Sequence, residues 1–129
     1  MYSISQVAEK LNIKPHTLRY YEQEGILESN RNHAGVRNYT EQQVKWLRFV
    51  LKLRETHMPV SSIQEYVKLL QEGEHTANKR LQLLEDHRAS IQQQIRELQD
   101  TEQMLEKKVS TYKDMIGNEV HLSISSYIK

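Results

Sequence analysis

A stretch of 40 residues, 77–116, contains neither proline nor glycine and repeats apolar side chains at heptad spacing. Alternating steps of four and three residues pass through twelve positions, of which ten are apolar or amphipathic. The positions are Ala77, Leu81, Leu84, Arg88, Ile91, Ile95, Leu98, Glu102, Leu105, Val109, Tyr112 and Ile116. The pattern predicts a single helix about 60 Å long. The residues before it are too few to cover such a stripe, so we expect a second chain to cover it.

Two polar residues, Arg88 and Glu102, interrupt this stripe. Polar residues at such positions set the register or orientation of a coiled coil rather than add stability. We therefore assign dimerisation to the apolar and aromatic members after Ala77. They are Leu81, Leu84, Ile91, Ile95, Leu98, Leu105, Val109, Tyr112 and Ile116.

The first 28 residues carry the signals of two short helices joined by a tight turn. Ser3 and Gln6 fit a capping box, and apolar residues then recur at helical spacing. Asn12 suits the turn because asparagine tolerates the left-handed backbone conformation. Pro15 can begin the second helix, and Gly25 can end it near Glu24. The layout predicts a helix-turn-helix, in which the second helix is the recognition helix.

Residues 29–39 lack helical periodicity and have turn residues at their centre. They predict a small hairpin, a wing, with Gly35 as the residue that its tight turn demands. Thr40 and Gln43 form a second capping-box pair before the next helix. That helix is apolar on several sides, which indicates the central packed element.

Pro59 breaks the third helix. A fourth helix is predicted from Ile63 to about Glu72, capped by Ser61 or Ser62 and ended by Gly73. Gly117 is expected to end the long helix. The remaining residues, 117–129, alternate weakly and are expected to be either strand-like or disordered, or docked on a partner subunit.

Charge is distributed unevenly along the chain. Residues 10–54 contain nine basic and four acidic side chains, a local net charge of +5 in a chain whose total is +1. A basic front half indicates an anionic partner. The chain has no cysteine, which excludes disulfides, thiolate metal sites and a thiol-based switch on this chain. No apolar run is long enough to span a membrane, so no membrane partner and a cytoplasmic location are expected.

Three local signatures together resemble the MerR family of transcriptional regulators. They are Thr17-Leu18-Arg19-Tyr20-Tyr21-Glu22 with Gly25-Ile26-Leu27, Gly35-Val36-Arg37-Asn38-Tyr39, and the helix pair around Pro59 that leads into a long helix. The resemblance covers about residues 1–116 and is closest to small members without a separate ligand-binding domain. It implies a mostly α fold, with a winged helix-turn-helix DNA-binding domain over residues 1–73. A long dimerisation helix would follow over residues 74–116 and form an antiparallel coiled coil.

The resemblance also implies which residues contact DNA. Arg19 can bridge a phosphate or bind guanine with two hydrogen bonds, and the alternative is a surface ion pair with Glu22 or Glu24. Tyr20 and Tyr21 combine packing rings with hydroxyl donors, and one of them can belong mostly to the core. The full set of candidate DNA contacts is Lys14, His16, Thr17, Arg19, Tyr20, Tyr21, Arg37, Tyr39 and Arg54.

Some of these candidates keep a second interpretation. His16 and Thr17 lie at the helix start, where side chains reach base edges, but they also fit an exposed polar turn. Arg54 fits either a phosphate contact or a solvated face. Lys45, Arg48 and Lys52 fit a solvated face better than a DNA contact.

The sequence departs from the family pattern at two positions. Lys14 stands where the recognition helix usually has a serine or threonine cap. Lys52 stands where electrophile-responsive relatives have a cysteine. Thiol sensing therefore cannot be transferred to this chain, and the sequence identifies no small-molecule effector.

Other kinds of site are not indicated. The six histidines lack the spacing of a metal site, so we expect no metal, and no cofactor is predicted. No catalytic arrangement stands out, so we expect no enzyme. Trp46, His57, Met58 and Tyr66 fit a small cavity between the third and fourth helices and the partner's long helix, or ordinary packing.

By resemblance, the function is that of a homodimer that binds an inverted repeat in double-stranded promoter DNA. The family bends and untwists promoters whose elements are too far apart, so that RNA polymerase can engage. Two alternatives stay open: a constitutive repressor or DNA-architectural protein of the same fold without an effector, and a coiled-coil module for protein interaction.

Overall fold

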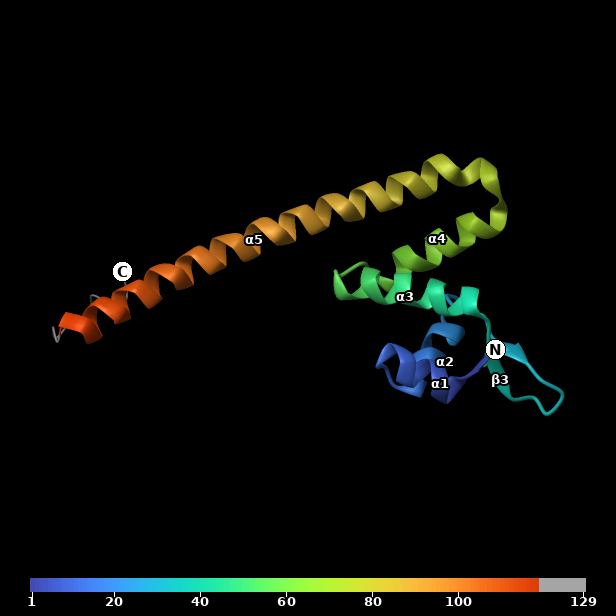
Figure 1. The fold of residues 1–129 in the computed structure, drawn as a ribbon. Coiled ribbons are helices and arrows are strands. Elements are labelled where there is room, and N and C mark those ends of the chain that lie inside the picture. Colours follow the sequence, from blue (N-terminus) through green and yellow to red (C-terminus); the bar gives the residue numbers. More distant parts are fainter. Residues whose placement is uncertain (119–129) are drawn as a thin grey trace. The chain divides into compact units, whose positions relative to one another are not determined.

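The computed structural model describes residues 1–118, and most of the predicted tail lies outside the described residues. The fold is mostly helical, as predicted, with one small sheet (Figure 1). The elements are β1 (Tyr2–Ser3), α1 (Ile4–Leu11), α2 (Pro15–Gln23), β2 (Asn30–Arg31), β3 (Arg37–Tyr39), α3 (Glu41–Glu55), α4 (Val60–Glu72), the 3-10 turn η1 (Glu74–Thr76) and α5 (Ala77–Asn118).

Residues 1–87 form one compact unit, which contains every element before α5 and the first turns of α5. The second unit begins at Arg88. The core of the first unit draws side chains from α1, α2, β3, α3 and α4. Val7, Leu18, Val50 and Ile63 are fully buried there. The short helices are therefore held by one shared apolar centre.

The predicted capping boxes are both confirmed. The Ser3 hydroxyl accepts from the backbone of Gln6, whose side chain accepts from Ser3 N–H at 2.8 Å. Thr40 and Gln43 make the same pair of hydrogen bonds at the start of α3. Because each box satisfies two otherwise unpaired N–H groups, both helices have a defined first residue.

Three helices end with a residue in the left-handed conformation. These residues are Asn12, Gly25 and His57, with φ angles of 55°, 74° and 73°. At the end of α3, Met58 N–H donates to the carbonyl of Leu53 at 2.9 Å, and both side chains are buried. This is a Schellman motif, which pairs the last carbonyls of a helix. The third helix therefore ends at Glu55, before the predicted break at Pro59.

Three local predictions were wrong or incomplete. The fourth helix begins at Val60, because the Pro59 carbonyl already accepts from Ser62 and Ile63, so neither serine caps it. Gly117 lies inside α5, which runs to Asn118. The two-residue strand β1, too short to show periodicity, pairs with β3 and gives the antiparallel order β1-β3-β2.

A buried histidine joins the beginning of α5 to the end of α3. The Nε2 atom of His87 lies 2.7 Å from the Thr56 hydroxyl, and the His87 side chain is buried. Burial lowers the pKa of His87, so the imidazole is neutral at pH 7. Heptad counting had left this residue outside the apolar stripe and without a role.

The stripe of α5 beyond the first unit is largely exposed. Leu98 and Ile116 are 70% and 72% exposed, and Leu105, Val109 and Tyr112 are also exposed. Within residues 1–118, no helix combines the length and apolarity that crossing a membrane requires. A row of exposed apolar side chains of this length marks an interaction surface.

The strained end of α3 gives a test of this description. We expect His57→Gly to raise the free energy of unfolding by about 0.5–1 kcal/mol, because glycine adopts the left-handed conformation without a steric penalty. Denaturant titration measures the change. Asn12→Gly is the matched control and should gain less, since asparagine already tolerates this conformation. A less stable His57→Gly variant would contradict the assigned helix end.

Candidate nucleic-acid interface

The helix α2 presents a polar face to solvent. Lys14, His16, Arg19 and Tyr20 are exposed, and Thr17 is half-buried. Pro15 occupies the first helical position, and Lys14 precedes it without a side-chain cap, as the sequence predicted. The N-terminal N–H groups of α2 therefore lack a side-chain partner and can face an anion.

The two neighbouring tyrosines of α2 have different environments. Tyr20 is 43% exposed, whereas Tyr21 is 6% exposed and belongs to the apolar core. Their ring centroids lie 5.6 Å apart. Tyr21 is thus a packing residue that supports Tyr20, and we remove it from the candidate DNA contacts.

Arg19 forms no ion pair with an acidic side chain of residues 1–118. Among residues 1–118 the ion pairs are Arg37–Glu22 and Lys52–Glu55, so the alternative of a surface pair between Arg19 and Glu22 or Glu24 is not formed. An exposed guanidinium without a carboxylate neighbour keeps its donors available for a phosphate or a guanine edge.

Glu22 binds two residues of the wing instead. Its Oε2 atom accepts from the Arg37 Nε at 2.7 Å, and its Oε1 atom accepts from the Tyr39 hydroxyl at 2.6 Å. The Tyr39 ring is 1% exposed and lies in the core. The Tyr39 hydroxyl therefore donates its hydrogen bond inside the protein. Its predicted role as a phosphate contact is corrected: Tyr39 attaches the wing to α2.

The pKa shifts of Glu22 and Tyr39 agree with a Glu22 carboxylate that stays ionised. Burial raises the pKa of Glu22, but the hydrogen bonds from Tyr39 and Arg37 outweigh burial and hold the pKa below its ordinary value. Burial, and then the hydrogen bond to Glu22, raises the pKa of Tyr39 well above its usual range. The tyrosine therefore remains a proton donor at all ordinary pH values.

Arg37 keeps donors free after this contact. Its Nε is bound to Glu22, its side chain is 28% exposed, and its two terminal nitrogens form no hydrogen bond within the described residues. A guanidinium held on one edge presents the other edge in a fixed direction. Arg37 thus remains a candidate phosphate contact.

The tip of the wing is ordered by its own side chains. The Asn32 side-chain oxygen accepts from the N–H groups of Ala34 and Val36 at 2.9 and 3.0 Å. Arg31 donates to the Gly35 carbonyl at 2.9 Å. Gly35 has a positive φ, as its predicted turn position requires.

The structure gives further information on two other sequence predictions, which concern Arg54 and a small cavity. Arg54 is exposed but donates to the Met58 carbonyl at 2.7 Å, so part of its guanidinium stabilises the turn after α3. Within one chain, the four residues offered for a small cavity with the partner's long helix have different surroundings, and that cavity stays a prediction. Met58 is core and His57 is exposed, while Trp46 and Tyr66 stack with an interplanar angle of 12°. Within residues 1–118, no group of acidic and histidine side chains is placed to hold a metal ion.

Comparison with known proteins identifies this arrangement. Residues 2–70 match the family described as MerR HTH family regulatory protein, and residues 44–108 match the family described as MerR, DNA binding. The chain belongs to the MerR family. It is therefore a DNA-binding transcriptional regulator by family, and its helices α1 and α2 with the wing are the winged helix-turn-helix of a MerR protein.

Individual relatives agree over nearly the whole chain. The HTH-type transcriptional regulator YyaN of Bacillus subtilis, itself uncharacterised, is 34% identical over 133 residues, which cover 93% of this chain and 96% of YyaN. The structure of HiNmlR, a MerR family regulator lacking the sensor domain and bound to promoter DNA, matches with a TM-score of 0.83 and 31% identity. That match covers 90% of this chain and 93% of HiNmlR.

A MerR family regulator from Listeria monocytogenes matches with a TM-score of 0.85 and 28% identity, over 92% of this chain and 91% of the other. In the present chain Lys52, the position for which the resemblance implied a cysteine in electrophile-responsive relatives, is exposed and pairs with Glu55 at 3.2 Å. An exposed lysine in an ion pair offers no substitute for a reactive thiol.

Glu22 is the functional residue that sequence reasoning missed. The sequence offered it only as a partner for Arg19, four residues or fewer away on the same helix. Its true partners are fifteen and seventeen residues later in the wing. The signal available was a carboxylate in a basic segment, but helical spacing gave no reason to pair it with the hairpin.

The cluster gives a prediction that depends on pH. We expect Glu22→Gln to lower the free energy of unfolding at pH 7 by about 1.5–3 kcal/mol, because it removes hydrogen bonds to a charged acceptor in a partly buried site. Since folding depresses the Glu22 pKa, its contribution is present above the ordinary carboxyl value of 4.5. The contribution is lost as pH falls through the lowered folded value.

Denaturant unfolding of both proteins between pH 7 and pH 3 measures the difference, which should shrink toward the acid end. Glu9→Gln, an exposed carboxylate on α1, is the matched control and should change stability little. A difference between wild type and Glu22→Gln that grows as pH falls would show that Glu22 is not stabilised as an anion.

Proposed function

We propose that this MerR protein binds an inverted repeat in promoter DNA as a homodimer and distorts the DNA to control transcription. The observation that carries the proposal is the unpaired Arg19 on the exposed face of α2, beside a wing that Glu22 fixes to the same helix. Two basic groups, Arg19 and Arg37, are then presented by one rigid unit.

The candidate DNA contacts fall into two groups, those that could reach base edges and those suited to phosphates. Arg19, His16 and Thr17 lie on the helix that would enter the major groove, so they are the candidates for contacts with base edges. Lys14, Tyr20 and Arg37 carry exposed donors suited to phosphates, and Arg54 retains part of its guanidinium for the same use. The distribution agrees with the local net charge of +5 over residues 10–54.

The homodimer follows from the exposed stripe of α5. Leu98, Leu105, Val109 and Ile116 are exposed within the described part of one chain. A second copy would bury them in a coiled coil, which the family resemblance implies to be antiparallel. Two recognition helices would then meet two half-sites, and the symmetry of the protein would match the inverted repeat.

Distortion of the DNA needs energy from such paired contacts. Bending a site of 20–30 base pairs costs about 1–6 kcal/mol. Two winged heads held apart by a stiff helix pair can supply this energy, because each head adds phosphate contacts on its own side. RNA polymerase is the partner that would use the altered promoter, and a small-molecule effector would modulate the distortion.

Arg19→Ala tests the contact that carries the proposal. We expect the variant to lose about 1–3 kcal/mol of specific binding, because a bidentate contact to guanine or phosphate disappears. Affinity for a duplex selected from a random pool should be measured at graded salt. Lys45→Ala, an exposed basic residue of α3, is the matched control and should bind almost normally. Unchanged affinity of Arg19→Ala would refute the assignment.

Leu98→Asp tests the dimer, because a carboxylate in the stripe cannot be buried without a partner charge. Light scattering should give the mass of two chains for the wild type and of one chain for the variant. Gln99→Asp, an exposed neighbour outside the stripe, should remain dimeric. A monomeric wild type at micromolar concentration would contradict the dimer.

The same proteins separate activation by distortion from plain repression. With RNA polymerase present, the wild type should protect two half-sites and expose untwisted DNA between them to chemical cleavage. The monomeric variant should protect neither at the same concentration. Protection without distortion, together with blocked transcription, would favour a constitutive repressor of the same fold.

A further inference from the structure

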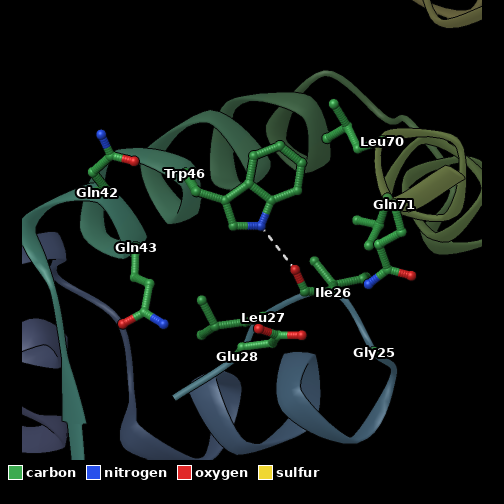
Figure 2. Close-up of a pocket in the computed structure, with 10 residues that line it drawn as sticks. Gly25, Ile26, Leu27, Glu28, Gln42, Gln43, Trp46, Leu70 and Gln71 are labelled. Carbon is green, nitrogen blue, oxygen red and sulfur yellow. Dashed lines mark hydrogen bonds between the residues drawn. The ribbon is translucent and has the colours of Figure 1, made fainter. Parts of the chain in front are cut away.

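A cavity lies where the segment that follows α2 meets α3 and α4. It has a volume of about 340 Å³ and is lined by the segment Gly25–Glu28, by Gln42, Gln43 and Trp46 of α3, and by the end of α4 (Figure 2). Natural sites for small molecules start at about this size. The DNA-binding function makes no use of this space.

The walls of the cavity are apolar, and one of them is aromatic. Ile26, Leu27, Val67 and Leu70 line it together with the indole of Trp46. The indole N–H already donates to the Ile26 carbonyl at 2.8 Å, as the dashed line in Figure 2 marks. The ring therefore offers no donor to a molecule in the cavity, but only the part of its π-surface that is not stacked on Tyr66.

The charge in the cavity has one sign. Glu28 is the charged residue among those that line it, and within residues 1–118 it forms no ion pair. The amides of Gln42 and Gln71 add carbonyl oxygens at the rim. A carboxylate beside an aromatic ring favours a cation and repels an anion.

We propose that this cavity binds a small organic cation with a flat apolar body, and that its occupancy changes the position of the recognition helix. The apolar body would lie against Trp46 and Leu70, and the positive group would face Glu28. The regulatory half of this inference rests on the proposed function; the binding half does not.

The cavity is linked directly to the end of the recognition helix. Gln64 of α4 donates to both the backbone carbonyl and the carboxylate of Glu24 at 2.9 Å. Ile26, which accepts from Trp46, donates its own N–H to the Tyr21 carbonyl at 2.9 Å. A molecule that binds more tightly when these hydrogen bonds are rearranged would favour that second arrangement. It then shifts DNA affinity by its difference in affinity for the two arrangements.

Trp46 is the one tryptophan of the sequence, so its fluorescence reports on the cavity. Three probes of similar shape separate the contributions: phenethylammonium, 2-phenylethanol and phenylacetate. We expect phenethylammonium to change the fluorescence saturably and to bind about 2–5-fold more tightly than the alcohol, which is the range of an ion pair with an exposed carboxylate such as Glu28. Phenylacetate should bind more weakly than the alcohol.

Variants assign the charge preference. Glu28→Gln should remove the preference for the ammonium probe and leave the alcohol's affinity unchanged. Glu65→Gln, an exposed carboxylate of α4 outside the cavity, should behave as the wild type. Val67→Phe should fill the cavity and weaken both probes, with circular dichroism used to verify that the variant is folded.

Several outcomes would overturn the binding site. They are equal affinity for all three probes, the absence of a saturable change, and an ammonium preference that survives Glu28→Gln. Shielding of Trp46 from iodide that depends on protein concentration would also overturn it, because a second copy of the chain would then cover the cavity.

The regulatory half has a separate readout. Operator affinity with saturating phenethylammonium should change at least about threefold in the wild type and not in Glu28→Gln. Binding of the probe without this change would overturn the regulatory half alone. Failure of the protein to bind any duplex would overturn the proposed function, while the fluorescence titration would still test the site.

Discussion

The carboxylate of Glu22 determines how the DNA-binding unit is put together. One of its oxygens binds Arg37 and the other binds Tyr39, so a residue of α2 attaches the central strand of the wing. Charge-assisted hydrogen bonds in a partly buried site are strong and directional. They convert a short hairpin and a short helix, neither of which is stable alone, into a single surface. Arg37 is then aimed outward by the residue that holds it.

The rest of the first unit supports this surface by local means. Capping boxes define where α1 and α3 begin, and left-handed residues define where α1, α2 and α3 end. These devices act within a few residues, so they specify short helices before the apolar core is complete. The core then adds Tyr21 beneath Tyr20 and the Tyr39 ring beneath the wing. In both places a buried aromatic ring packs beneath an exposed part of the surface.

The segment from Glu24 to Glu28 links α2 to helices α3 and α4. It follows the recognition helix, and two of its backbone carbonyls accept hydrogen bonds from the side chains of Trp46 in α3 and Gln64 in α4. Hydrogen bonds therefore join α3 and α4 directly to the segment that follows α2. Because the chain has no cysteine, a signal that acts here cannot use a thiol of this chain, whereas it can use noncovalent contacts. The apolar cavity with its single acidic residue offers such contacts.

Local patterns in the sequence determined much of this protein. Ser3 with Gln6, Pro15, Gly25, Gly35 and the proline-free heptads predicted the helices, the wing turn and the long helix, because caps, turns and periodicity act over a few residues. Only the tertiary structure decided which side chains of the motif are free. Arg19 and Tyr20 are exposed, whereas Tyr21 and Tyr39 are core and Glu22 belongs to the wing. These partners lie fifteen or more residues apart, and no local period relates them. Burial and pairing between distant segments depend on how the elements pack, which the order of residues alone does not state.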